Sequence, residues 1–331
     1  MKPTVLDICS GAGGEAIGLE QAGFEHLASI EIDPAACQTL RLNRPRWNVI
    51  ESDIRMVRGQ DFHDIDLFAG GVPCPPFTVA GKQLGADDER DLFPEALRLI
   101  AETGPKAVLL ENVPGFATTK FEAYRNALIV RLASMGYAVS WKILNAAAFG
   151  VPQLRPRFVL VGLQQPYAAS FRWPEPGCFT STVGQAIGDL MAARGWQGVA
   201  QWRLKANSVA PTLVGGSKKH GGPDLGPTRA RKQWETLGVD GCGIADQAPG
   251  EDFPIDGLPK LTLRMTARLQ AFPDTWNFVG GKTATYRQIG NAFPPPVARA
   301  VGEAIMAALL GKHDEQDTNK IYPFQPILLR N

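Results

Sequence analysis

The chain has 331 residues, 44% of them hydrophobic and 20% charged, which is ordinary for a folded soluble protein large enough for two domains. The formal net charge of +1 gives no global sign of a nucleic-acid or membrane partner, and no apolar stretch approaches the roughly 20 residues of a membrane span. The five cysteines are scattered without a CxxC pair and no signal-peptide pattern precedes the first strand, so we expect a cytoplasmic protein with no disulfide framework and no metal.

Residues 1–163 alternate short apolar strands with helical stretches, which predicts a mostly parallel α/β sheet with helices on both faces. A strand over 4–10 ends in a glycine-rich loop, and a helix follows up to Gly23. Asp33 caps the helix over 33–43, with Pro34 in its first turn. The other expected strands are 25–32, 65–71, 106–113 and 158–163, and the other expected helices are 92–103 and 121–136, the latter ending at Gly136.

The composition changes near residue 164. From there to residue 261 lie 15 of the 35 glycines and nine of the 26 prolines, without a long helical period, which predicts a smaller, loop-rich second domain. Helices return over 261–272 and 291–311, and the second of these ends at Gly311. We therefore expect one domain of residues 1–163 plus 262–331 and a second of residues 164–261.

Charge is segregated within this second region. Residues 203–232 hold seven Lys and Arg side chains against Asp224 alone, while residues 233–256 hold six acids and no Lys or Arg. A basic run is most often a solvated face. The glycines interleaved in GGSKKHGG, residues 215–222, favour a binding surface instead, because they let backbone approach a ligand closely.

The sequence DICSGAGG, residues 7–14, ends the first strand in a glycine-rich turn before a helix, where a cofactor can lie against bare backbone. Glu31 ends the second strand and can accept two ribose hydroxyls. Asp53 ends a third strand and can accept from an adenine amino group. The spacing G-x-G-G differs from the dinucleotide pattern GxGxxG, which favours a nucleoside-type cofactor. The alternative is a glycine loop that serves only a tight turn.

Cys74 lies in FAGGVPCPPFTVAGKQ, residues 68–83, directly after an apolar strand. Pro73, Pro75 and Pro76 fix their own backbone and push the residues before them out of the helical region. A lone cysteine is usually a small buried hydrophobe, but a core position rarely needs so stiff a backbone. We interpret Cys74 as a nucleophile held at a strand end.

Glu111 follows the apolar strand in LLENV, where burial raises the pKa of a carboxyl and makes it a proton donor near neutral pH. Capping of the next element or pairing with a base is the alternative. Gln153, Arg155 and Arg157 alternate in VPQLRPRFVLVG, so we expect them on one face of a strand with both guanidiniums aimed together. Paired arginines suit an anion or a phosphate, and a surface salt bridge is the alternative.

The motifs DICSGAGG, PCPPF, ENV, QLRPR, RLQAFPD and QIGNAF occur in the order and approximate spacing typical of the cytosine-C5 DNA methyltransferases, which this chain resembles. The resemblance leaves out mainly residues 164–261, which correspond to the variable target-recognition domain of that family. Members use S-adenosylmethionine on a Rossmann-like sheet, with a smaller domain across a DNA cleft. The resemblance implies a DNA (cytosine-5)-methyltransferase of bacterial or phage modification type, and we expect a monomer that binds double-stranded DNA.

The resemblance also implies roles for the matching residues. Cys74 resembles the nucleophile that adds to C6 of a flipped-out cytosine, and Glu111 the acid that protonates or hydrogen-bonds N3. Arg155 and Arg157 resemble the residues that hold the cytosine carbonyl and a neighbouring phosphate. The implied cofactor contacts are Asp7, Ser10, Gly11, Ala12, Gly13, Gly14, Glu31, Ile32, Asp53, Ile54, Gly71, Pro73, Leu92, Asn291 and Ala292. The expected DNA contacts are Thr78, Gln83, Gln153, Lys205, Lys218, Lys219, Arg229 and Arg231, and the polar loop from Thr78 to Arg90 is expected to close over the base.

Three positions depart from the family pattern. Cys9 stands where an aromatic residue is usual, Ile32 where a bulky residue often stacks on adenine, and Met265 where an acid is usual near RLQAFP. The first two imply differently packed cofactor contacts, and the third puts a structural contact in doubt.

The nearest alternative is a transfer-RNA cytosine methyltransferase, because CFT at 178–180 resembles a short motif of that branch. PPF after Cys74 and the extent of the recognition region favour DNA. A nicotinamide-dependent oxidoreductase predicts a GxGxxG loop and gives no role to Cys74 with Glu111. A non-catalytic DNA-binding relative typically lacks the thiol or the acid, and both are present. The target sequence stays open, as does the choice between a solitary enzyme, a phage enzyme and one with a cognate restriction endonuclease as genetic partner.

Overall fold

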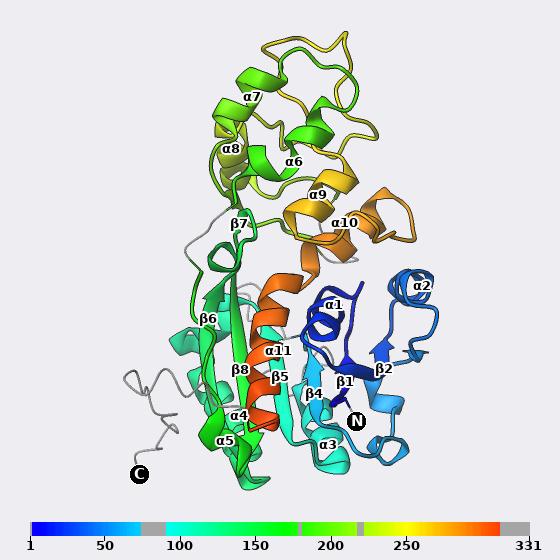
Figure 1. Ribbon diagram of the computed structural model, residues 1–331, viewed down its shortest axis with the longest axis vertical. Helices are drawn as coiled ribbons and strands as arrows, with labels where there is room; N and C mark the ends of the chain where they lie inside the picture. The colour runs from blue at the N-terminus through cyan, green and yellow to red at the C-terminus, as the bar shows by residue number, and fades with distance from the viewer. Residues whose placement is uncertain (1, 74–90, 178–180, 217–221, 312–331) are drawn as a thin grey trace.

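The computed structural model describes residues 2–73, 91–177, 181–216 and 222–311, and Figure 1 shows their arrangement. A seven-stranded sheet with the strand order β3-β2-β1-β4-β5-β8-β6 forms the centre of the lower part of the molecule. Each strand expected from an apolar run lies in this sheet. The strands are β1 (Thr4–Ile8), β2 (Glu25–Glu31), β3 (Val49–Glu51), β4 (Leu67–Gly70), β5 (Ala107–Asn112), β6 (Tyr137–Asn145) and β8 (Pro156–Gln164).

The first five strands pair in parallel, and β8 pairs antiparallel with both β5 and β6. The mostly parallel α/β sheet predicted from the sequence is therefore confirmed. Parallel strands bring their carboxyl ends to one edge of the sheet, where ligands bind in open α/β folds. Glu31 and Gly70 end β2 and β4, while Asp7 and Glu111 each precede the last residue of β1 and β5. This edge gathers the residues that the sequence singled out.

Helices cover both faces of the sheet, because successive strand residues point to opposite sides and both sides are apolar. One face packs against α3 (Phe93–Thr103) and α4 (Glu122–Ser134), and the other against α1 (Gly14–Gln21) and α11 (Pro295–Leu309). The strand residues on the first face include Leu6, Phe68 and Val108, and those on the second include Val5, Leu67 and Leu109. The alternation of neighbouring residues between two cores accounts for the continuous apolar runs.

Local signals in the sequence determine several helix ends. Asp33 caps α2 (Pro34–Asn43) by accepting a hydrogen bond from the backbone of Ala35 at 3.0 Å, and Pro34 opens the helix. Gly136 and Gly311, with φ of 92° and 62°, follow α4 and α11 in the left-handed conformation that ends a helix. These predictions are confirmed. No helix in the described ranges is long and apolar enough to cross a membrane.

The upper part of the molecule in Figure 1 has a hydrophobic cluster of its own. Five helices contribute to it: α6 (Val183–Ala192), α7 (Val199–Lys205), α8 (Thr228–Thr236), α9 (Leu263–Leu269) and α10 (Lys282–Asn291). The first three lie where the sequence indicated loops, because helices of seven to ten residues are too short to show a long period. The cluster includes Leu261, Met265 and Tyr286, so a boundary after residue 261 divides one packed unit.

Shorter elements connect these two parts. The two residues of β7 (Gln153–Leu154) pair in parallel with β9 (Ala210–Pro211) as a separate small sheet. The short helix α5 (Tyr167–Ser170) follows β8 and packs against α11. The chain therefore passes from β6 through β7 to β8. The strand β9, which comes later in the chain, pairs with β7 at this junction.

Met265 keeps the contact that the missing acid put in doubt. The Thr262 hydroxyl accepts from the backbone N–H of Met265 at 3.3 Å, and the Met265 sulfur accepts from the backbone N–H of Thr262 at 3.4 Å. The reciprocal arrangement of a capping box at the start of α9 is thus present, with a thioether, a weaker acceptor, in place of a carboxylate.

Candidate active site

The glycine-rich turn after β1 is held by hydrogen bonds from its own residues and from a distant tryptophan. Ser10 is buried and donates its hydroxyl to the backbone carbonyl of Asp7 at 3.0 Å. The Trp276 indole donates to the carbonyl of Ala12 at 3.1 Å. The conformation of the turn therefore depends on residues far apart in the sequence.

The glycines of this turn serve two different purposes. A Cβ on Gly14 would lie 2.4 Å from the carbonyl oxygen of Phe293, and one on Gly13 would lie 2.8 Å from Leu40. Close packing requires these two glycines. A Cβ on Gly11 would meet nothing within 4 Å, so the backbone at Gly11 is open to a ligand. Packing and ligand access, which the sequence presented as alternatives, therefore apply to different glycines of one turn.

The Glu31 carboxylate ties this turn to the end of β2. One oxygen accepts from the backbone N–H of Gly11 at 2.8 Å, and the other accepts from Ile32 at 2.9 Å and Asp33 at 2.7 Å. Burial raises the pKa of Glu31, and these backbone donors oppose the rise. A carboxylate offers about four acceptor positions. The three bonds leave about one of them for a ribose hydroxyl, where the sequence suggested two.

Ile32 and Asp53 lie on the segments that follow β2 and β3. The Ile32 side chain is 61% exposed, which leaves an apolar surface next to the Glu31 carboxylate. Asp53 caps the short 3-10 helix Ile54–Met56 by accepting from the backbone N–H of Arg55 at 3.0 Å, and it also pairs with the Arg55 side chain at 3.4 Å. Asp53 is therefore held in a defined orientation at the carboxyl edge.

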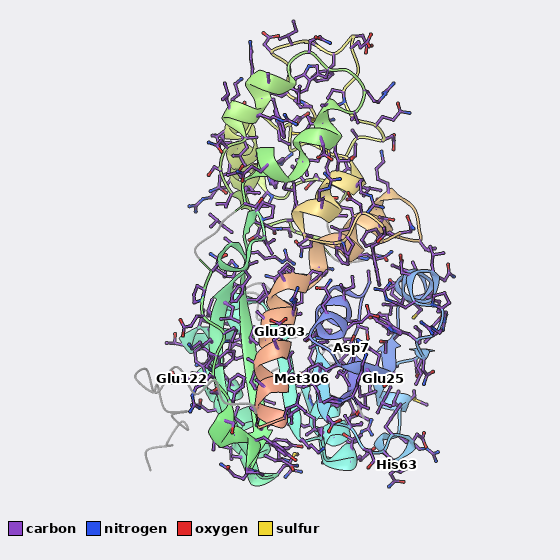
Figure 2. The ribbon with its side chains drawn as sticks, viewed as in Figure 1. Asp7, Glu25, His63, Glu122, Glu303 and Met306 are labelled. Carbon is purple, nitrogen blue, oxygen red and sulfur yellow. The ribbon has the colours of Figure 1, made fainter. Side chains whose placement is uncertain are left out.

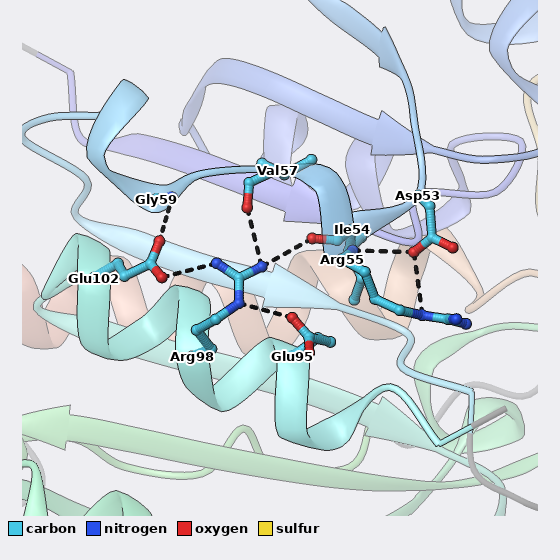
Figure 3. Close-up of polar contacts among 8 residues, drawn as sticks. All are labelled: Asp53, Ile54, Arg55, Val57, Gly59, Glu95, Arg98 and Glu102. Carbon is cyan, nitrogen blue, oxygen red and sulfur yellow. Dashed lines mark hydrogen bonds and ion pairs between the residues drawn. The ribbon is translucent and has the colours of Figure 1, made fainter. Parts of the chain in front are cut away.

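Arg98 on α3 braces the turn that carries Asp53, as Figure 3 shows. Its guanidinium donates to the backbone carbonyls of Ile54 at 3.1 Å and Val57 at 3.0 Å. Glu95 and Glu102, one turn before and one turn after on the same helix, bind its other nitrogen atoms at 2.7 Å and 2.8 Å. Sequence reasoning missed Arg98, for which the helical spacing of the three charges was the available signal.

A buried ion pair occupies the end of β5. The Arg157 Nε lies 2.8 Å from Glu111 Oε1, and the two side chains are 9% and 11% exposed. Burial raises the pKa of Glu111, while Arg157 and then Arg155 oppose the rise. A Cβ on Gly71 would lie 3.3 Å from Glu111 Oε2, so the second oxygen lies beside the chain that leads from β4 toward Cys74.

Both ends of the segment that carries Cys74 are anchored. The Asn112 amide donates to the carbonyl of Val72 at 2.9 Å, next to the exposed Pro73. At the other end, Asp91 accepts from the Tyr124 hydroxyl at 2.5 Å, and Leu92 follows as the residue that begins α3. Residues 74–90 lie outside the described part of the chain, and with them the predicted nucleophile Cys74 and the predicted DNA contacts Thr78 and Gln83.

The position of Arg155 corrects one expectation. The residue falls between β7 and β8, so the three alternating side chains do not follow one strand. Its fully buried guanidinium donates to the backbone carbonyls of Leu213 at 2.7 Å, Gly290 at 2.7 Å and Ala292 at 3.0 Å, and among the described residues only its Nε finds no partner. Arg155 therefore joins segments of the protein and does not present a paired guanidinium to a phosphate.

Gln153 requires the same correction as a predicted DNA contact. Its side chain is 0% exposed. The amide oxygen accepts from the backbone N–H of Leu213 at 2.8 Å, and the amide nitrogen donates to the Leu269 carbonyl at 3.2 Å and to Gln270 Oε1 at 2.8 Å. Both polar groups of the amide are engaged inside the protein, so Gln153 has no surface to offer DNA in this structure.

The end of α10 joins this network. Asn291 is exposed and donates its side-chain amide to the carbonyl of Gly216 at 3.1 Å. The carbonyl of Ala292 accepts from Gln270 at 2.6 Å as well as from Arg155. These two predicted cofactor residues therefore adjoin the backbone that leads into the glycine-rich basic run.

Residues 3–307 match the family described as C-5 cytosine-specific DNA methylase. This chain belongs to that family. The Type II methyltransferase M.NgoMIV of Neisseria gonorrhoeae is 56% identical, with 93% of this chain and 99% of the relative covered. M.NaeI of Lentzea aerocolonigenes is 53% identical, with 92% of this chain and 75% of the relative covered.

Solved structures agree on the fold. A putative DNA modification methyltransferase from an Escherichia coli prophage has a TM-score of 0.66 at 23% identity, covering 93% of this chain and 99% of its own. The Dnmt2 methyltransferase of S. pombe has a TM-score of 0.63 at 19% identity, covering 94% and 99%. This chain is thus a cytosine-C5 DNA methyltransferase that uses S-adenosylmethionine, and the transfer-RNA alternative is not favoured.

The described residues of this methyltransferase fit a cationic cofactor. Both carboxyl oxygens of Asp7 and Oε1 of Glu15 are buried and, in the described structure, lack hydrogen-bond partners. Burial raises the pKa of Asp7 to about 8, and Glu31 adds to the rise. Buried acids without partners are costly unless a ligand satisfies them, and S-adenosylmethionine carries positive charge on its sulfur and amino group. Within the described ranges no group of three His, Cys, Asp or Glu side chains is arranged to hold a metal ion.

The methyltransferase presents part of its basic run on helices. Lys205 ends α7 and Arg229 lies on α8, and both are exposed. Arg231 is half-buried, with Nη1 3.6 Å from Cys242 Sγ. Arg229 and Lys232 line a shallow hollow on α8. Lys218 and Lys219 lie outside the described residues.

Proposed function

We propose that this enzyme methylates C5 of a flipped-out cytosine through a covalent bond between Cys74 and C6 of the base. The ring atoms of a stacked cytosine are inaccessible in a duplex, and C5 becomes nucleophilic only after a thiolate adds at C6. As the S–C6 bond forms, Glu111 donates a proton or a hydrogen bond to N3. C5 then takes the methyl group, a base removes the C5 proton, and the S–C6 bond breaks to restore the thiolate while N3 returns any proton it took to Glu111. S-adenosylmethionine supplies the methyl group on a positively charged sulfur.

The Glu111–Arg157 ion pair is the observation that carries this proposal. Burial raises the pKa of Glu111, which favours donation of a proton or a hydrogen bond, while Arg157 and Arg155 oppose the rise. Arg157 holds one oxygen at 2.8 Å, and the other lies toward the Cys74 segment. We assign the contact with the cytosine carbonyl to Arg157, because the nitrogens that Arg155 would use already bond backbone carbonyls.

A duplex that carries 5-fluorocytosine at the target position tests the covalent step. Fluorine cannot leave C5 as a proton does, so the wild-type enzyme should remain bonded to the DNA in the presence of S-adenosylmethionine. Cys74→Ala should form no adduct and transfer no methyl group while it still binds the cofactor. Denaturing electrophoresis and mass spectrometry measure the adduct. Appreciable turnover by the alanine variant would contradict the assignment of Cys74.

For the cofactor, we propose that the open backbone at Gly11, the remaining acceptor position of Glu31 and the exposed face of Ile32 hold the nucleoside, with Asp53 on the adenine amino group. The support is the shared location of these groups at the ends of β1, β2 and β3. Glu31→Ala should weaken S-adenosylmethionine by roughly 1–3 kcal/mol through lost charge-assisted bonds, as measured by calorimetry. Equal loss in Glu25→Ala, which changes an exposed acid at the start of β2, would contradict this specific role.

We also propose that residues 164–261 form a target-recognition domain that selects the DNA sequence without taking part in the chemistry. The basic run supports this division, since phosphate contacts position a protein and base contacts specify the site, and the hydrophobic cluster of this part continues beyond residue 261 into α9 and α10. A chimera with this segment from a relative of different specificity should methylate the donor's site in bisulfite maps of plasmid DNA. Its junction must preserve the packing of Leu261, Met265 and Tyr286. A chimera that keeps the original site would place specificity elsewhere.

We further propose that the enzyme works as a cytoplasmic monomer and that a cognate restriction endonuclease is its genetic partner. The Type II names of two relatives support this pairing. Plasmid DNA from cells that make the enzyme should resist one endonuclease specificity, and the protein should sediment as a single chain. DNA that stays sensitive at every site that bisulfite mapping finds methylated would contradict the protective role.

A further inference from the structure

We infer that Glu15 recognises the positive charge on the cofactor's sulfur and thereby favours S-adenosylmethionine over its uncharged-sulfur product, S-adenosylhomocysteine. The inference rests on the cofactor used by the family and adds a residue that none of the predicted contacts includes. Three features of the structure support it: the place of Glu15 in the fold, its unsatisfied burial, and the groups that face it.

Glu15 lies between the cofactor turn and the proposed base site. It is the second residue of α1, directly after the glycine-rich turn. The charged groups that interact with it are Asp7 at the end of β1 and Glu111 at the end of β5. Because β4 is the strand between β1 and β5, Asp7 and Glu111 flank the carboxyl end of β4, and Glu15 interacts with both. A methyl group must pass between the cofactor and the cytosine in this neighbourhood.

Capping of the helix does not account for this side chain. An acid in the first turn stabilises a helix from an exposed position, where water satisfies its oxygens. Glu15 is instead 4% exposed, and within the described part of the chain its Oε1 has no hydrogen-bond partner. Burial, Asp7 and Glu111 all raise the pKa of Glu15. Such a carboxyl is costly in the free protein, and a nearby cation offsets that cost.

The groups that interact with Glu15 are acids and a thiol, so we infer that the ligand supplies the positive charge. β1 contributes Asp7, Cys9 directly follows it, and β5 contributes Glu111. Two arginines of the described chain act on Glu111: Arg157 pairs with it at 2.8 Å, and Arg155 donates to backbone carbonyls. On the other side of α1, the chain at the start of α11 brings the carbonyl oxygen of Phe293 to Gly14.

The two ligands differ in the feature that Glu15 would read. Both carry the same nucleoside and amino-acid groups, but methyl transfer removes the positive charge from sulfur. A carboxylate a few ångströms away in a site shielded from water lowers the free energy of the charged ligand and leaves that of the product nearly unchanged. Glu15 would therefore help the product to leave after each turnover.

Calorimetric titration of the full-length protein with S-adenosylmethionine and with S-adenosylhomocysteine tests the inference. In Glu15→Gln the dissociation constant of S-adenosylmethionine should rise roughly tenfold, while that of S-adenosylhomocysteine should stay unchanged. Glu15→Asp, which keeps the charge, should retain part of the preference. Glu25→Gln is the matched control, because Glu25 is exposed at the start of β2, opposite Thr4, whereas Asp7 lies near the end of β1; Figure 2 labels both acids.

Proton release gives a second readout that a purely structural role would not change. Burial and two neighbouring acids raise the pKa of Glu15 and a bound cation lowers it, so titrations in buffers of different ionisation enthalpy should show more protons released with S-adenosylmethionine than with the product. This difference should vanish in Glu15→Gln. If Glu15→Gln keeps both the preference and the extra proton release, the inference is wrong. A wild-type protein that binds neither ligand would instead overturn the cofactor assignment itself.

Discussion

Two buried polar groups near the carboxyl edge of the sheet differ in whether the protein satisfies them. Asp7 and Glu15 have buried oxygens that no hydrogen bond reaches within the described chain. Gln153 and Arg155 are equally buried, but they bond the backbone of Leu213 and further carbonyls on α9 and α10. Sequence alone assigned Asp7, Gln153 and Arg155 to ligands and did not single out Glu15. The structure separates them, because a satisfied polar group builds the protein whereas an unsatisfied one indicates a ligand.

The difference is functional as well as structural. The Arg155 network links β8, the segment that leads into the basic run, and the end of α10 into one unit. Asp7 interacts with Glu31, and Glu15 interacts with Asp7 and Glu111. The first group therefore joins parts of the enzyme, whereas these acids favour a bound cation. The following changes test this contrast, beginning with the largest expected effect.

Glu111→Gln should have the largest effect, because Glu111 has both a structural partner and a proposed catalytic role. Its pairing with Arg157 is structural, whereas its second oxygen lies toward the Cys74 segment. The rate of methyl transfer should fall about 10²- to 10⁴-fold, the usual range for a lost general acid, with little change in cofactor affinity. Radiolabelled methyl transfer under single-turnover conditions measures the rate. Glu122→Gln, at the exposed start of α4, should be neutral. If the variant mainly lost cofactor affinity, Glu111 would contact the cofactor and not the base.

Arg155→Met should destabilise the whole protein. It leaves the carbonyls of Leu213 and Gly290 without their Arg155 donor and removes one of two side-chain donors to Ala292, at a cost of about 3–5 kcal/mol in the free energy of unfolding. Denaturant unfolding followed by tryptophan fluorescence measures the change, and Lys205→Met, an exposed change, should stay within about 0.5 kcal/mol. A stable Arg155→Met protein that binds cofactor but not DNA would restore the original expectation that Arg155 holds a phosphate.

Asp7→Asn should stabilise the cofactor-free protein although it weakens binding of the cofactor. The folded protein raises the pKa of Asp7 from 3.8 to about 8, so between these values the folded state binds more protons than the unfolded state. Stability of the cofactor-free enzyme should therefore fall as pH rises from about 4 to about 8, and the asparagine variant should lack this part of the slope. Near pH 8 it should be about 1–3 kcal/mol more stable than wild type and bind S-adenosylmethionine more weakly.

Thermal unfolding at several pH values, with and without S-adenosylmethionine, measures this effect. The matched control is Asp256→Asn, which changes an exposed acid distant from the sheet edge. Identical pH profiles for Asp7→Asn and the wild type would mean that the Asp7 carboxyl has a partner after all.

Arg98→Ala should have the smallest effect. Arg98 touches no proposed ligand but holds the carbonyls of Ile54 and Val57, next to Asp53. Cofactor affinity should fall roughly threefold to tenfold, which corresponds to the free energy of about one hydrogen bond, because Asp53 is positioned less well. The maximal rate should stay unchanged. Arg98→Lys should rescue part of the loss, since one ammonium cannot reach all four partners. An unchanged affinity would show that the turn that carries Asp53 keeps its conformation without Arg98.

Much of the framework could be predicted from local sequence. The strands, the cap at Asp33 and the glycine ends of α4 and α11 depend on neighbours within a few residues, and all of them are present. The positions of Glu31 and Glu111 at strand ends follow for the same reason. The short helices α6, α7 and α8 could not be predicted in this way, because helices of seven to ten residues are stabilised by packing around Trp202 and Trp234 rather than by their own pattern.

The sequence by itself determined the family, the sheet and the residue types at its carboxyl edge, because motif order and strand periodicity are written along the chain. Only the tertiary structure decided which of those residues are satisfied. Gln153 and Arg155 meet carbonyls about 60 to 140 positions away, whereas Oε1 of Glu15 meets no partner within the described chain. A hydrogen bond depends on distances of about 3 Å between atoms. Such distances between remote residues exist only once the chain has folded, and they separate the residues that build this enzyme from those that await its cofactor.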